Sequence, residues 1–211
     1  IENAIGGTDF TFGFDTAPNI AMEALDRLHS TAEAHHRAML LELMGRDAGF
    51  ITLHAGLAGG ADVILIPEIP FNFASICRKI NERRERGSFF SILAVAEGAQ
   101  QAGGEQVISL PGDAVYVPRL GGIGQVVAEH IAKSCQVETR VTVLGHLQRG
   151  GPPTPWDRQL CTRYGVFAVE LIAAGNFGTM AALKNQGIEA VSLKEAIAKA
   201  YLKKVTLHGY A

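Results

Sequence analysis

The sequence has few of the features that define several large classes of protein. Its three cysteines, Cys77, Cys135 and Cys161, stand far apart and form neither a CxxC pair nor a Cys/His spacing suited to a metal. We expect them to be small apolar core residues in a reduced, cytoplasmic compartment. No apolar run reaches the roughly 18 residues that a membrane span needs, so no membrane partner is expected.

The sequence also has little net charge. The formal net charge of −2 gives no overall reason to expect binding to nucleic acid or to a membrane surface. The first residues, Ile1 to Ile5, have neither a basic segment nor an apolar core, so they do not make a signal peptide. Because the chain does not start with Met, we expect it to begin inside a longer protein.

What the sequence does contain indicates a folded domain with glycine-rich loops. With 211 residues, 47% of them apolar, it can bury roughly 70% of its unfolded surface. Its 24 glycines exceed the average usage of roughly 7% and gather in short loops. Such loops predict backbone that packs closely against a ligand.

Helix and strand signals alternate along the chain. Nearly continuous apolar runs separated by amphipathic segments predict a parallel sheet covered on both faces, so the predicted class is α/β with a three-layer sandwich. Residues 99–120 read as a loop in which 106–109 could pair briefly. The expected strands are 38–43, 63–66, 90–96 and 140–144, and the expected helices are 16–27 or longer, 49–58, 73–86, 123–134, 156–173 and one from 192.

Polar residues follow the expected strands. Met44-Gly45-Arg46, Glu97-Gly98 and the segment 145–151 each end one strand, and Pro67-Glu68 ends a fourth. Ligands of open α/β sheets bind at the carboxyl ends of the strands. Arginine matches phosphate bidentately and a carboxylate accepts hydrogen bonds from hydroxyls, so the predicted ligand is a phosphorylated sugar or polyol. The alternative is that these residues cap strands and pair with each other on the surface.

Several weaker signals favour ordinary structural roles. The segment 121–124, GGIG, could be a phosphate-binding turn, but without GxGxxG spacing it is better read as the start of a helix. The basic run at 83–86 reads as a solvated helix end. His35 reads as a surface or capping residue and Trp156 as a packing residue.

The order of several short segments adds a family resemblance. They resemble the phosphofructokinase family from residue 1 to about residue 183. The segments are TDFTFGFDTA at 8–17, HR at 36–37, MGR at 44–46, GGAD at 59–62, PE at 67–68 and GHLQRGG at 145–151. The resemblance implies two interleaved domains with the first truncated: 1–13 end the phosphoryl-donor domain, 14–147 form the sugar-phosphate domain, 148–198 return to the donor domain, and 199–211 are a C-terminal tail.

The resemblance implies a glycolytic phosphotransferase. It would move a phosphoryl group to the 1-hydroxyl of fructose 6-phosphate and form fructose 1,6-bisphosphate, with Mg²⁺ and with ATP or pyrophosphate as donor. Arg46 would stabilise charge in the transition state, and Glu97 would hold sugar hydroxyls. The substrate-contacting positions carried over from the family are Met44, Gly45, Arg46, Glu97, His146 and Arg149.

Two further arginines, Arg37 and Arg140, resemble the pair that reaches the 6-phosphate of a neighbouring subunit. A homo-oligomer, a tetramer or a dimer, would follow. Members of the family are often allosteric, but Phe89 and Phe90 stand where a basic segment that binds a regulatory nucleotide would continue, which argues against that regulation.

The first residues depart from the family pattern. The catalytic base is the first Asp of a TIDND-like motif, and here Glu2 stands at that position and Ala4 at the second acidic one. The extra methylene of Glu2 moves its oxygens by about 1 Å, which can cost on the order of a hundredfold in rate. One alternative is therefore an impaired or regulatory subunit that binds sugar phosphate without turnover, and another is an unrelated sugar-phosphate binding module. The donor-binding glycine segment and the metal ligands are not identified.

Overall fold

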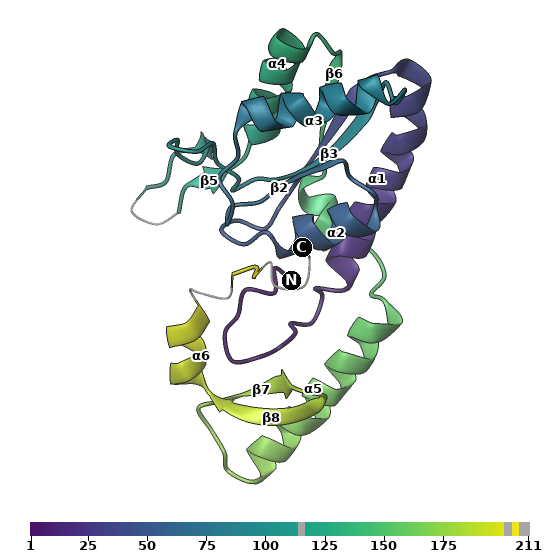
Figure 1. Cartoon of the computed structure of the whole chain (residues 1–211). Helices are drawn as coiled ribbons and strands as arrows, with labels where there is room; N and C mark the ends of the chain where they lie inside the picture. The colour runs from purple at the N-terminus through teal and green to yellow at the C-terminus, as the bar shows by residue number, and fades with distance from the viewer. Residues whose placement is uncertain (114–116, 201–203, 207–211) are drawn as a thin grey trace.

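The centre of the molecule is a four-stranded parallel sheet (Figure 1). The computed structural model describes residues 1–113, 117–200 and 204–206. Strands β2 (Val63–Leu65), β3 (Ser91–Ala96), β1 (Ala38–Leu43) and β6 (Thr139–Val143) lie in the order β2-β3-β1-β6, and every pairing is parallel. The predicted α/β class with a mostly parallel sheet is confirmed.

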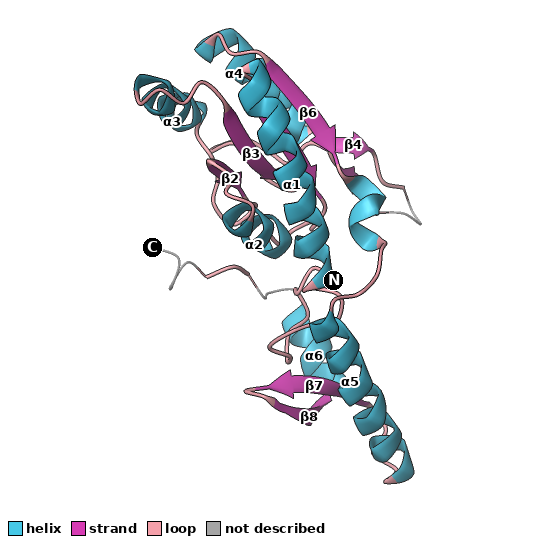
Figure 2. Cartoon of the chain, turned by 90° about the vertical axis from the view of Figure 1, so that its right-hand side faces the viewer, coloured by secondary structure: helices cyan, strands magenta, loops and turns pink. Residues whose placement is uncertain are grey.

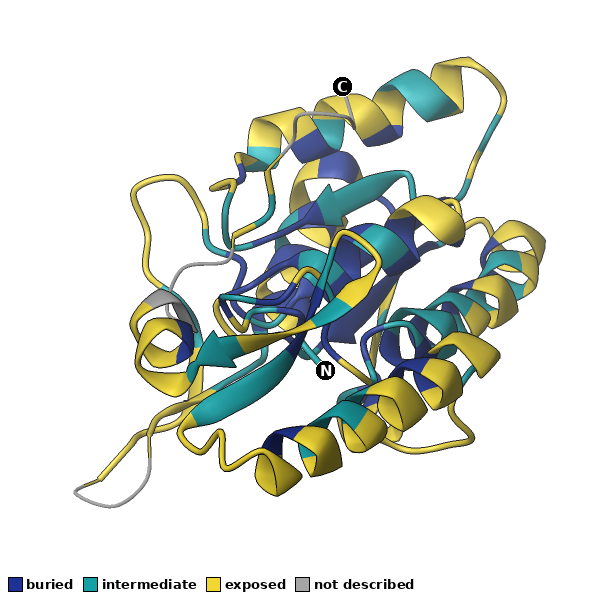
Figure 3. Cartoon of the chain, turned by 90° about the horizontal axis from the view of Figure 1, so that it is seen from below, coloured by how far each residue is buried: buried dark blue, intermediate teal, exposed yellow. Residues whose placement is uncertain are grey.

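The two central strands are buried at every residue. Their sequences, AMLLEL and SILAVA, are nearly continuous apolar runs, as expected for strands with both faces covered. Figure 3 shows these strands as the buried centre, with exposed residues on the outer helices. The edge strand β6 is mostly exposed, and its sequence, TRVTV, contains polar residues between its two valines and at its start.

Helices cover both faces of the sheet, so the sheet and the two helical layers make the three predicted layers. On one face lie α1 (Thr16–His35) and α2 (Phe50–Ala58), and on the other lie α3 (Phe73–Glu85) and α4 (Ile123–Cys135). Each face has its own core. The first includes Leu25, Met39, Leu41, Ala55 and Ile92, and the second includes Leu40, Ile76, Leu93, Val127 and Ile131. Alternate residues of β1 therefore serve opposite faces.

A second lobe lies beyond one end of the sheet (Figure 2). It contains α5 (Pro155–Ala173), the antiparallel pair β7 (Thr179–Lys184) and β8 (Gly187–Ser192), and α6 (Leu193–Ala200). Both helices were predicted from the sequence, but the β7–β8 hairpin was not. A second short pair, β4 (Ile108–Leu110) with β5 (Arg119–Leu120), lies close to the brief pairing expected within 99–120.

The expectation that all three cysteines are reduced core residues is wrong, although Cys135 is buried in the core and Cys77 packs against it. Cys77 in α3 and Cys135 at the end of α4 form a disulfide with a Cα–Cα separation of 5.8 Å, and Cys161 is exposed. The two helices pack on the same face of the sheet, so residues 58 apart in sequence meet. The sequence could not predict this pair, because the two cysteines are not in a CxxC motif.

The lengths and composition of the helices agree with the absence of a long apolar run in the sequence. Among the described residues, no helix combines the length and the apolar character that crossing a membrane would require.

Candidate substrate site at the carboxyl ends of the strands

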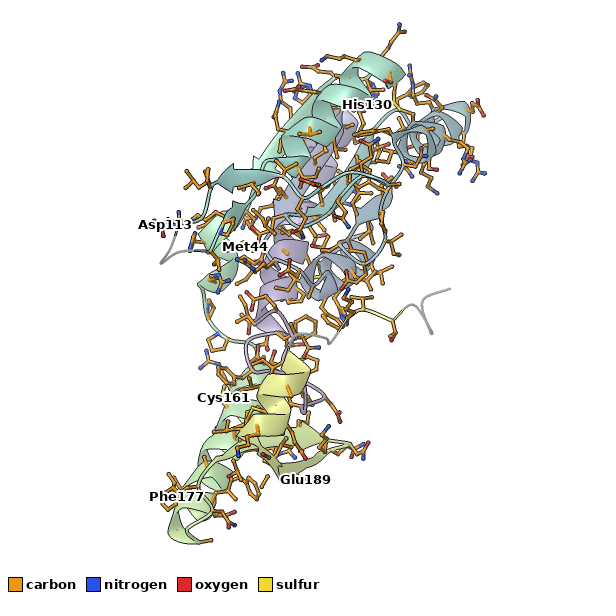
Figure 4. All side chains as sticks on the ribbon, turned by 90° about the vertical axis from the view of Figure 1, so that its left-hand side faces the viewer. Met44, Asp113, His130, Cys161, Phe177 and Glu189 are labelled. Carbon is orange, nitrogen blue, oxygen red and sulfur yellow. A yellow bond between two sulfur atoms is a disulfide. The ribbon has the colours of Figure 1, made fainter. Side chains whose placement is uncertain are left out.

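A cleft of about 1090 Å³ lies at the carboxyl ends of the parallel strands. Segments that follow β1, β3 and β6 line it, together with the first residues, the β4–β5 hairpin and Lys204 near the C-terminus. Met44 lies at the end of the sheet that faces the second lobe (Figure 4). The predicted site residues in its lining are Glu2, Met44, Gly45, Arg46, Glu97, His146 and Arg149. The cleft therefore lies at the strand ends where the sequence predicts a ligand to bind.

The turn after β1 is held by two side chains from other strand ends. The Gln148 side chain accepts a hydrogen bond from the Met44 backbone N–H (3.1 Å) and donates one to the Met44 carbonyl (3.2 Å). Glu97 Oε1 accepts hydrogen bonds from the N–H groups of Gly45 (3.2 Å) and Arg46 (3.0 Å). One oxygen of Glu97 thus fixes the turn, a role that the sequence did not predict.

Glu2 and Arg149 form an ion pair across the cleft. The Arg149 Nη2 to Glu2 Oε1 distance is 2.6 Å, and both side chains are partly exposed. Burial raises the pKa of Glu2, but the Ile1 amino group, a backbone hydrogen bond and the Arg149 guanidinium together lower it below the ordinary value of 4.5. Glu2 is therefore ionised at neutral pH, with one oxygen on Arg149 and the other 3.4 Å from the Ile1 nitrogen.

The cationic groups of the cleft differ in how they are paired. Arg46 lies 3.4 Å from Asp47, its sequence neighbour, and its side chain is half exposed. His146 and Arg149 come from the short helix η1 (Gly145–Arg149) and are exposed to solvent. Guanidinium groups with exposed forks are suited to phosphate, because they can donate two parallel hydrogen bonds.

A buried carboxylate that the sequence analysis missed closes one wall of the cleft. Glu42, 3% exposed within β1, accepts hydrogen bonds from the N–H groups of Gly122 (2.9 Å) and Gly124 (2.8 Å). These are the N–H groups at the start of α4, so a protein carboxylate fills the place that a ligand phosphate would need. The interpretation of GGIG as a helix start is confirmed. The signal was a single Glu inside an otherwise apolar strand.

A second carboxylate joins three segments near the cleft. Glu68, after β2, accepts hydrogen bonds from Gly49 N–H at the start of α2 (3.0 Å) and from Val205 N–H (3.2 Å). The chain therefore returns to the sheet after the second lobe.

The basic run 83–86 is not merely a solvated helix end. Arg83 pairs with Asp62 (2.6 Å) and lies over the ring of Phe90, and Arg84 donates to the Cys135 carbonyl (3.2 Å). These contacts tie α3 to its neighbours, and sequence periodicity could not show them.

Arg37 and Arg140 lie at the other end of the sheet. Both contact the carboxylate of Glu138: Arg37 Nε lies 2.9 Å from Oε2, and Arg140 Nη2 lies 2.5 Å from Oε1. Arg37 and Met44 flank β1 and are seven positions apart, which is roughly 23 Å along a strand. An extended arginine side chain cannot span that distance, so this pair does not reach the cleft of its own chain.

The described residues do not form a metal site by themselves. No group of three His, Cys, Asp or Glu side chains in the described ranges is arranged to hold an ion. At the position where the family has its acidic pair, the cleft offers Glu2, already paired with Arg149, and Ala4. The residues present do not fit a resident Mg²⁺.

Comparisons with known proteins agree with this geometry. A sequence model of the family described as Phosphofructokinase matches residues 1–172. The chain is 55% identical over 196 residues to the ATP-dependent 6-phosphofructokinase of Chloroflexus aurantiacus, covering 93% of this chain and 53% of that protein. It is 53% identical over 211 residues to the pyrophosphate--fructose 6-phosphate 1-phosphotransferase of Amycolatopsis mediterranei, covering all of this chain and 61% of that protein.

Solved structures give the same result. The fold matches phosphofructokinase from Saccharomyces cerevisiae with a TM-score of 0.79 and 31% identity, over 93% of this chain and 25% of that one. It matches pyrophosphate-dependent phosphofructokinase from Marinobacter aquaeolei with a TM-score of 0.78 and 26% identity, over 98% of this chain and 52% of that one. The chain spans about half the length of the curated relatives it matches. It belongs to the phosphofructokinase family.

Proposed function

We propose that this chain carries the sugar-phosphate half of a 6-phosphofructokinase, a phosphotransferase that forms fructose 1,6-bisphosphate from fructose 6-phosphate in glycolysis. One observation supports the proposal above all. Arg46, Glu97, His146 and Arg149, which come from the ends of three different strands, line a single cleft. The family match and relatives named for this reaction add to it.

Phosphoryl transfer depends on positioning and on neutralising charge more than on covalent chemistry by the protein. In the proposed site Arg46 stabilises the charge that develops on the transferred group. Glu97 keeps one oxygen on the Met44–Arg46 turn and offers the other to sugar hydroxyls. His146 and Arg149 bind the substrate from the helix that follows β6, and Met44 and Gly45 contact it through the turn.

Glu2 is the proposed base for the 1-hydroxyl of the sugar. It lines the cleft beside the Arg149 guanidinium, whose charge favours the unprotonated carboxylate that can accept a proton. Arg149 lies 2.6 Å from it and would orient the carboxylate. The proton moves from the 1-hydroxyl to Glu2 as the sugar oxygen attacks the phosphoryl group. The bond from that phosphorus to the bridging oxygen of the donor breaks, and ADP leaves from ATP or phosphate leaves from pyrophosphate.

We further propose that Arg37 and Arg140 complete the site of a second copy of this chain. Their distance from their own cleft and their partial exposure at the amino ends of β1 and β6 favour this arrangement. The protein would then act as a homo-oligomer, a dimer or a tetramer. A variant without both arginines should lose affinity for fructose 6-phosphate and keep its donor affinity.

The donor would be ATP or pyrophosphate, since relatives named for each donor match the chain about equally well. Magnesium would enter with the donor phosphates rather than as a resident ion. Residues 1–13 and 148–198 would belong to the donor domain, residues 14–147 to the sugar-phosphate domain, and 199–211 to a tail that crosses back. The return of Val205 to Glu68 supports the last assignment.

A cytoplasmic location would fit a glycolytic reaction. Cytosolic reductants keep most thiols reduced, so in that compartment the Cys77–Cys135 bridge would form only under oxidising conditions.

A second candidate is a subunit that binds the sugar phosphate without turnover. Ala4 and the extra methylene of Glu2 favour it. Replacing Glu2 and Ala4 with Asp separates the two candidates, because activity that appears only after the change supports the second.

The test of the main proposal uses the full-length protein that contains these 211 residues. A coupled assay follows fructose 1,6-bisphosphate with ATP and then with pyrophosphate, each with Mg²⁺. We expect product with one of the two donors. No product with either donor, from folded protein, refutes the proposal.

A further inference from the structure

Gln148 makes an unusual contact for a buried side chain. It is 1% exposed and forms two hydrogen bonds with one residue, accepting from the Met44 N–H (3.1 Å) and donating to the Met44 carbonyl (3.2 Å). The two residues are 104 positions apart, on segments that follow β6 and β1. This pairing extends the β1–β6 contact past the end of the strands, because the Gln148 amide takes the place of a strand backbone.

The turn that Gln148 holds has a strained backbone. Arg46 has φ 49°, a left-handed conformation that a residue with a side chain seldom adopts, and Gly45 has φ 154°. A bend of this kind persists only where its surroundings fix it. Glu97 binds the N–H groups of Gly45 and Arg46 from one side, and the Ala48 N–H donates to the Gly45 carbonyl (3.0 Å).

The turn also packs tightly against the end of β3. A Cβ added to Gly98 would lie 1.9 Å from the Arg46 carbonyl oxygen. The turn is thus confined by Glu97 and Gly98 after β3 and by Gln148 after β6. Of these contacts, Gln148 alone holds Met44, the residue at which the chain leaves β1.

The chemistry of the contact selects glutamine. A carboxylate at this position could accept from the Met44 N–H but could not donate to the carbonyl, and a methionine has no donor and only a weak sulfur acceptor. Asparagine is one methylene shorter. Each of these replacements would remove at least one of the two hydrogen bonds with Met44, which favours a shift of the turn.

We propose that Gln148 is a positioning residue that sets the Met44–Arg46 turn and thereby aims Arg46 at the transferred phosphoryl group. The proposal rests on the proposed function and deepens it. The helix η1 then has two roles: His146 and Arg149 serve the cleft directly, and Gln148, between them, faces inward and fixes the turn from which Arg46 projects.

The test is a double-mutant cycle in the full-length protein with Gln148→Met and Arg46→Ala. Displacement of a reacting group by about 1 Å can cost on the order of a hundredfold. We therefore expect Q148M to lower kcat by about 10- to 100-fold, with the KM for the donor unchanged. In the R46A background the same change should lower kcat by less than about twofold, because Gln148 acts through Arg46.

Asn72→Ala is the matched control for general destabilisation. Asn72 is exposed, caps α3 by accepting from the Ala74 N–H (2.8 Å), and is not among the residues that line the cleft. N72A should lower the melting temperature and leave kcat unchanged below it. The proposal is overturned if folded Q148M keeps the kcat of the original protein, or if it loses the same factor whether or not Arg46 is present.

Failure of the proposed function can be told apart from failure of this inference. If the original protein is inactive with both donors, the proposed reaction is wrong, and the cycle is then measured as the Kd for fructose 6-phosphate by calorimetry. Coupling between Gln148 and Arg46 in that Kd supports the positioning role. Independent effects, or no binding at all, overturn it.

Discussion

The two ends of the same parallel sheet hold their arginines in different ways. At the carboxyl ends, backbone hydrogen bonds to Gln148 and Glu97 fix the turn that carries Arg46. At the amino ends, Arg37 and Arg140 are joined only through the exposed carboxylate of Glu138. The first arrangement fixes one geometry through backbone hydrogen bonds, whereas the second consists of ion pairs between partly exposed side chains. A site completed within one chain can be rigid, and a site offered to another molecule needs accessible groups.

The largest expected effect lies at the rigid end. Replacing Arg46 with Ala should lower kcat by about 10³-fold, because it removes a charge aimed at the transition state. The melting temperature should change little, since the Arg46 side chain is half exposed. Steady-state kinetics and a thermal melt measure the two quantities. A loss confined to KM would mean that Arg46 only binds substrate.

The close approach at Gly98 gives the next effect. Gly98→Ala places a methyl group 1.9 Å from the Arg46 carbonyl, so the turn must move. We expect kcat to fall by on the order of a hundredfold. Gly103→Ala is the control for a glycine in a nearby loop; it has open space around it but a positive φ of 76°, so it tests backbone strain without the clash. Equal losses of kcat in both variants would contradict the confined turn.

The disulfide stabilises the amino ends rather than the cleft. Cys135 ends α4 just before β6, and the Cys77–Cys135 bridge closes a segment of 58 residues. Reduction should lower the free energy of unfolding by about 4 kcal/mol on the chain-entropy account. Urea unfolding with and without reductant measures it. An unchanged unfolding midpoint would show that the bridge does not constrain the chain.

The smallest expected effect is the pH dependence of the ion pairs of Glu138. Hydrogen bonding from Arg37, with the charges of Arg37 and Arg140, lowers the pKa of Glu138 below 4.5. A lowered pKa means that the ion pairs are complete above 4.5 and are lost only as the pH falls through the lowered value. An NMR titration of the Glu138 carboxyl carbon should show a midpoint below 4.5, and a midpoint at or above it would contradict the pairing.

Much of the fold could be predicted because the spacing of apolar residues differs between helices and buried strands. The strand at 38–43 and the helix start at Thr16 match the structure, and the predicted cleft residues follow from the rule that ligands meet parallel strands at their carboxyl ends. The hairpin β7–β8 was missed because its turn, Asn185-Gln186, lacks the usual Asn-Gly pair.

Long-range contacts account for the rest of what the sequence could not show. Gln148 and Met44 are 104 residues apart, and Glu42 and Gly122 are 80 apart, so no local pattern links them. A single polar residue inside an apolar strand was the one available signal for Glu42. The ion pair between Arg37 and Glu138 could not be predicted either, because Glu138, just before the exposed edge strand β6, looks like an ordinary surface residue in the sequence.

Calorimetric titration of fructose 6-phosphate into the full-length protein tests most directly whether these strand ends form a sugar-phosphate site. The structure predicts one saturable site per chain, with tighter binding of fructose 6-phosphate than of glucose 6-phosphate and a loss of at least about tenfold in affinity when Arg149 is replaced by Ala. Equal affinity for the two sugar phosphates, or affinity unaffected by that replacement, would contradict it.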